Sequence, residues 1–112
     1  MASSEAERLH EIYTAYREAD RAKRRDLREA VSEEEVDAVL DTVDALKAVY
    51  YRAVNVALDA TGPLVEAAWA EARDANKRIR EARETAAALP ERIRLGARVL
   101  DSIQKLVEAA DG

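Results

Sequence analysis

Glu7 and His10 are the residues whose types and spacing come closest to a reactive site. A Glu-x-x-His pair shares one helix face and supplies ligands to carboxylate-bridged metal sites in helical bundles. Such a site needs a second copy of the motif and two further carboxylates, whereas this chain has a single histidine. We therefore expect His10 to be a solvent-facing side chain, and we predict no metal and no other cofactor.

Residues for nucleophilic catalysis are equally sparse. A Ser or Thr nucleophile needs a neighbouring base, and the chain offers one His and no Cys. Ser4 and Ser32 stand where helices are expected to begin, and neither GxxxxGK[ST] nor GxGxxG occurs. These absences predict a protein that is not an enzyme.

The composition indicates long helices. Alanine fills 24 of the 112 positions, 37% of residues are charged, and the chain has three Gly, two Pro and no Phe. No run approaches the ~18 apolar residues of a membrane span, and the N-terminus lacks the pattern of a signal peptide. We expect one all-α domain over residues 1–112, in the cytoplasm. Fourteen arginines against four lysines, with the high alanine content, suggest a GC-rich bacterial or phage gene.

Local signals divide this domain into helices. Ser4 with Glu7, and Ser32 with Glu35, match the capping box at a helix start. Gly62-Pro63 combines a residue suited to a helix end with one suited to a helix start. The predicted helices span about 4–30, 33–60, 63–89 and 91–110.

One heptad frame continues from Val65 to Ala110 without a change of phase, and all fourteen of its seam positions are small or apolar. A seam of this kind has to pack against another helix, as in a coiled coil. Its alanines allow a close approach. The residues predicted to form an interface are Val65, Ala68, Ala72, Ala75, Ile79, Ala82, Leu89, Ile93, Leu100, Ile103 and Val107.

Pro90 interrupts this frame and leaves two architectures open. If Pro90 only kinks a helix over 63–110, the fold is an antiparallel bundle of three long helices. The third helix is then ~70 Å long, and two helices of ~40 Å cannot cover it. If the chain turns at Pro90, four helices close an up-down-up-down bundle alone. No Gly stands beside Pro90, and Leu89 is a poor N-cap, so the local sequence does not favour a break. The three-helix and four-helix architectures both remain open.

The negative charge is concentrated in one segment. Residues 32–62 carry seven acidic and two basic groups and so account for the net charge of −5. The candidate acidic patch is Glu33, Glu34, Asp37, Asp41 and Asp44. We expect it to face basic residues across a helical hairpin. Two basic clusters could supply them, namely Arg21, Lys23, Arg24, Arg25 and Arg28, or Arg73, Lys77, Arg78, Arg80 and Arg83.

The aromatic residues are few, so their positions are informative. Tyr13, Tyr16 and Tyr50 fall on apolar faces and are expected to pack together, whereas Tyr51 lies off the seam and is expected to be exposed. Trp69 lies beside the seam and is expected to be a core or half-core anchor.

Three functions fit these features. The first is a protein that associates with other proteins, self-assembling through the Val65–Ala110 seam as a homo-oligomer or acting as an adaptor. The second is a small acidic inhibitor or immunity-type protein that binds a basic protein surface through its second helix. The third is a lipid- or granule-surface protein with amphipathic helices. The sequence pI near 5.0 and interleaved acids argue against nucleic acid as the partner.

Overall fold

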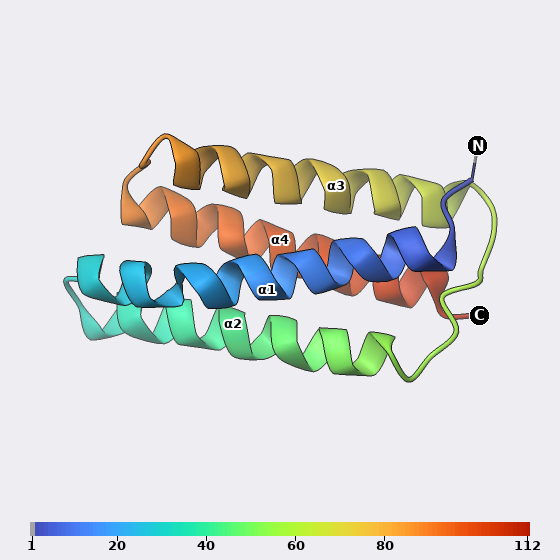
Figure 1. Ribbon diagram of the computed structural model, residues 1–112, viewed down its shortest axis with the longest axis horizontal. Helices are drawn as coiled ribbons and strands as arrows, with labels where there is room; N and C mark the ends of the chain where they lie inside the picture. Colours follow the sequence, from blue (N-terminus) through green and yellow to red (C-terminus); the bar gives the residue numbers. More distant parts are fainter. Residues whose placement is uncertain (1) are drawn as a thin grey trace.

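The computed structural model describes residues 2–112; Met1, part of the predicted domain, lies outside the described residues. The helices are α1 (Glu5–Glu29), α2 (Glu33–Ala53), α3 (Pro63–Glu84) and α4 (Leu89–Ala110). They form an elongated antiparallel bundle of 43 × 25 × 18 Å (Figure 1). The predicted all-α class is confirmed, in its four-helix form. Within residues 2–112, no helix is both long and apolar enough to cross a membrane.

The bundle consists of two helical hairpins, α1/α2 and α3/α4, with α4 at the centre. Helix α4 packs against the other three helices, whereas α2 and α3, as described here, do not touch. The segment 54–62 therefore crosses the end of the bundle where both chain termini lie (Figure 1). Because α4 is covered on several sides, it buries Leu95, Val99 and Leu106 in addition to the predicted seam residues Ile103 and Val107.

The starts of α1 and α2 follow the sequence signals, but the end of α2 does not. Ser4 and Glu7 form the full capping box, and the Ser32 hydroxyl accepts a hydrogen bond from the Glu35 amide. The prediction that the second helix continues to residue 60 is wrong, because α2 ends at Ala53. Residues 54–62 are instead needed to connect α2 to α3, which does not lie next to it. Leu58 of this segment is buried in the core.

The chain turns before Pro90, which excludes the kinked three-helix alternative. Helix α3 ends at Glu84, earlier than the predicted 89, and α4 begins at Leu89 with Pro90 in its first turn. Ala86 occupies the left-handed region (φ 53°), and the Ala87 amide donates to the Ala82 carbonyl at 2.9 Å. This resembles the usual left-handed helix end, with Ala in the place where Gly is common.

A buried arginine at one end of the bundle joins the two hairpins. The Arg8 guanidinium donates to the carbonyls of Leu58 (2.7 Å) and Ala60 (2.8 Å) and to the Glu66 carboxylate (2.9 Å). Ser3 adds its amide and hydroxyl to the same carboxylate. These residues, here called the Arg8 clamp, tie α1 and the N-terminal segment to the crossover and to α3.

A second buried arginine acts at the opposite end. Arg92 of α4 donates to Asp26 (2.9 Å) and Glu29 (2.7 Å) of α1 and to the carbonyl of Ala87 in the turn. Burial lowers the pKa of Arg92, but hydrogen bonds to Glu29 and Asp26 outweigh it and raise that pKa overall. This Arg92 clamp holds both the end of α1 and the turn that precedes α4.

Replacing Pro90 tests the position of the turn. A proline in the first helical turn loses no intrahelical hydrogen bond, so Pro90→Ala is expected to change the free energy of unfolding by less than about 1 kcal/mol. A proline inside a continuous helix would cost about 3 kcal/mol, and its removal would recover that amount. Urea unfolding followed by circular dichroism distinguishes the two results.

Removing the guanidinium of the Arg8 clamp should be costly. Arg8→Met leaves the carbonyls of Leu58 and Ala60 without its donors and Glu66 without its cation, so we expect a loss of about 3 kcal/mol in the free energy of unfolding. The matched control is Arg98→Met, because Arg98 is exposed and makes no ion pair with any residue in 2–112. Equal effects of the two changes in urea unfolding would contradict this role for Arg8.

Glu66 should make stability depend on pH. The Ser3 amide, followed by the Ser3 hydroxyl and Arg8, holds the pKa of Glu66 below its ordinary value of 4.5. Its ionised form therefore stabilises the fold above pH 4.5 and loses this effect as the pH falls through the lower folded-state pKa. Glu66→Gln should destabilise the protein at pH 7, and the difference from wild type should shrink below pH 4.5. A difference that does not change from pH 7 to pH 3 would contradict this.

Candidate functional site

The predicted interface seam lies mostly inside the bundle. Eight of its eleven residues are buried within the single chain: Val65, Ala72, Ala75, Ile79, Ala82, Leu89, Ile103 and Val107. Ala68, Ile93 and Leu100 are half-buried. Because the buried side chains already pack against other helices of the same chain, they are not open to a second copy. The reason for assigning the seam to self-association is therefore removed.

The residues considered for chemistry, Glu7 and His10, bond to different neighbours along the chain. His10 is exposed, and its Nε2 lies 3.5 Å from the Thr14 hydroxyl. Glu7 is engaged in the capping box, where its carboxylate accepts from the Ser4 amide at 2.9 Å. No group of three potential metal ligands comes together anywhere in residues 2–112.

The acidic patch forms a row along the outside of α2. Glu34, Asp37, Asp41 and Asp44 follow each other at intervals of three or four residues, and Glu33 lies beside them; all five are exposed. This acidic stripe extends over about 15 Å. It faces away from the side of α2 that buries Val39, Val43 and Leu46.

None of the five carboxylates takes part in an ion pair with any described residue. Eight acids on the other three helices do form ion pairs, whereas others, such as Glu71 and Glu108, do not; the eight are Glu18, Asp20, Asp26, Glu29, Glu66, Asp74, Glu91 and Asp101. The expected pairing of the acidic patch with basic residues across a hairpin is therefore wrong. Arg80 and Arg83 of α3 pair with Glu18 of α1, and Arg25 pairs with Glu29 of its own helix.

The tyrosines gather where the C-terminal half of α2 packs on the N-terminal half of α1. Ring centroids lie 5.1 Å apart for Tyr13 and Tyr50 and 5.9 Å apart for Tyr16 and Tyr50. Tyr51 is 52% exposed, as expected from its position off the seam, and Lys47 lies over its ring. Tyr13 is also exposed, so this packed cluster presents an aromatic edge to solvent.

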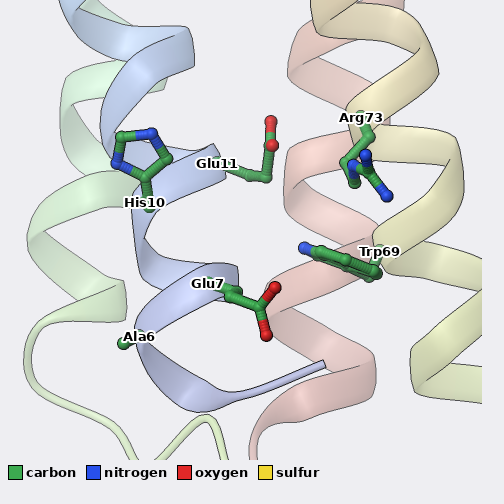
Figure 2. Close-up of a pocket in the computed structure, with 6 residues that line it drawn as sticks. All are labelled: Ala6, Glu7, His10, Glu11, Trp69 and Arg73. Carbon is green, nitrogen blue, oxygen red and sulfur yellow. The ribbon is translucent and has the colours of Figure 1, made fainter. Parts of the chain in front are cut away.

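A hollow of about 440 Å³ separates the start of α1 from α3. It is lined by Ala6, Glu7, His10 and Glu11 of α1 and by Trp69 and Arg73 of α3 (Figure 2). The Arg73 guanidinium stacks on the indole at 4.6 Å. Trp69 is half-buried, in agreement with its expected role, but its buried Nε1–H finds no acceptor in the described part of the chain.

No protein family, curated protein or solved structure matches this chain. The surfaces are therefore the basis for inferring function. The acidic stripe and the aromatic edge can bind other molecules by charge and by apolar contact, respectively. The Trp69 hollow combines both kinds of contact. The sequence could indicate the stripe, since its acids lie close together along one predicted helix. It could not indicate the hollow, which joins residues about 60 positions apart.

Proposed function

We propose that this chain is a non-enzymatic binding protein that docks on a basic protein surface through the acidic stripe of α2, in the manner of a small acidic inhibitor or immunity-type protein. The observation that carries the proposal is the row of five exposed carboxylates without intramolecular partners. The Tyr51 ring, farther along α2, provides an apolar contact near the end of the row.

The fold gains little from this row. Like charges three or four residues apart destabilise a helix by about 0.2–0.5 kcal/mol per pair. Glu33 and Glu34 lie in the first turn, where the helix dipole favours them, but Asp41 and Asp44 lie beyond the reach of that effect. Binding to a basic partner gives these carboxylates a role, because a concentrated field raises the rate of encounter and selects for opposite charge.

The other two functions have less support. Self-association through the seam would require the buried residues of α3 and α4 to leave the core. Binding to a lipid surface would require an open apolar helix face, yet the apolar faces pack inward and the outer face of α2 is acidic. Anionic lipid surfaces repel such a face.

Charge reversal on the stripe tests the proposal. Binding of the wild-type chain to cytochrome c, used as a basic probe protein, should weaken as salt is added, because the Debye length shortens from about 10 Å at 0.1 M ionic strength to about 3 Å at 1 M. Asp37→Lys/Asp41→Lys should weaken that binding about tenfold at low salt. Isothermal titration calorimetry measures both effects.

The matched control reverses two carboxylates of the other hairpin. Glu71→Lys/Glu108→Lys produces the same change in net charge on exposed sites of α3 and α4. Binding should stay within about twofold of wild type for this pair. If both double variants lose affinity equally, overall charge rather than the α2 stripe governs binding, and the proposed function is contradicted.

A further inference from the structure

The Trp69 hollow has walls of unequal charge. Its α1 wall carries the carboxylates of Glu7 and Glu11, and its α3 wall carries the indole of Trp69 and one guanidinium, that of Arg73 (Figure 2). Two carboxylates thus face one guanidinium. The hollow therefore favours a cation over an anion.

In each of the two carboxylates, one oxygen accepts a hydrogen bond that holds the group in place. Oε1 of Glu7 accepts from the Ser4 amide at 2.9 Å, and Oε2 of Glu11 accepts from the Asn76 side chain at 2.8 Å. Asn76 is itself buried, with 2% of its surface exposed, so it fixes Glu11 firmly. The second oxygen of each carboxylate makes no hydrogen bond with residues 2–112, which leaves two oriented acceptors for a ligand.

The indole ring adds a surface that already binds a cation. Arg73 lies over it at 4.6 Å and forms no ion pair in the described chain. Figure 2 shows Arg73 and Glu7 on opposite sides of the ring plane, so the side toward Glu7 is not covered by Arg73. A cation against an aromatic face gains about 0.5–2 kcal/mol.

We propose that this hollow anchors a lysine or arginine side chain of the basic partner, with the cation against the face of Trp69 toward Glu7, beside the free oxygen of Glu7, while Glu11 adds negative charge from the other side of the ring plane. This inference rests on the proposed function and deepens it. The acidic stripe supplies attraction over a distance, and the hollow supplies one specific contact. The stripe lies on α2, which does not form the hollow, so each can be disabled separately.

Trp69 reports on the hollow directly, because it is the one tryptophan of the chain. The probe is a tetra-arginine peptide with blocked termini, titrated into the 112-residue chain while tryptophan emission is recorded. A saturable change in emission is expected with this peptide and not with blocked tetraglutamate. An absent response, or an equal response to both peptides, overturns the proposal.

The variant Glu7→Gln/Glu11→Gln removes two charges while keeping an acceptor for the Ser4 amide and for Asn76, since Gln also serves in a capping box. It should weaken peptide binding at Trp69 at least tenfold. The matched pair Asp37→Asn/Asp41→Asn makes the same charge change on the stripe and should leave the emission titration within twofold of wild type. Equal weakening by both pairs overturns the proposal.

Two further measurements distinguish a failure of the Trp69 anchor from a failure of the docking role of α2. In the wild-type protein, the NMR signal of the Trp69 indole N–H should move on adding tetra-arginine; if it does not, the anchor is overturned whatever the variants do. A failure of the stripe variants to weaken cytochrome c binding contradicts the docking role of α2 alone. A silent Trp69 with intact stripe-dependent binding contradicts the anchor alone.

Discussion

The constraint on which the fold depends is the burial of the apolar seam from Val65 to Ala110. A seam that long has to find a cover, and the turn at residues 85–88 lets its two halves cover each other. Helix α4 then becomes the centre of the bundle, with Ile103, Leu106 and Val107 fully enclosed. The α1/α2 hairpin packs against this centre and completes the core. Everything that remains available for binding is consequently on the outer faces of the helices.

Two buried guanidinium groups fix the hairpins at opposite ends, Arg8 to Glu66 and Arg92 to Asp26 and Glu29. Arg8 also donates to two backbone carbonyls of the crossover, and Arg92 to one carbonyl of the turn before α4. Arg8 thus holds the crossover in place, and Arg92 holds the turn before α4. The clamps pair three acids of α1 and α3 with buried arginines, whereas none of the five carboxylates of the acidic stripe forms an ion pair with a described residue, and this contrast leads to the proposed docking role.

The sequence predicts what local signals encode. The helix starts at Ser4, Ser32 and Pro63 are correct because capping and proline geometry depend on neighbours within a few residues. The turn before Pro90 stayed open because Ala86, not Gly, takes the left-handed position and no side chain caps α4. The clamps were missed, although Arg8 stands four residues before the core residue Ile12 and Arg92 three residues before the core residue Leu95, because most of their partners are 50 or more residues away.

The distance between α3 and α4 is the most direct test of whether the seam closes on itself. The chain has no cysteine, so Glu71→Cys/Lys105→Cys allows two nitroxide labels at chosen sites, diluted with unlabelled protein to exclude intermolecular signals. Both residues line one hollow between α3 and α4. Electron–electron double resonance should give a separation of about 20 Å or less, in keeping with packed helices. A separation near 50 Å, the length of a continuous helix over these residues, would contradict the closed seam.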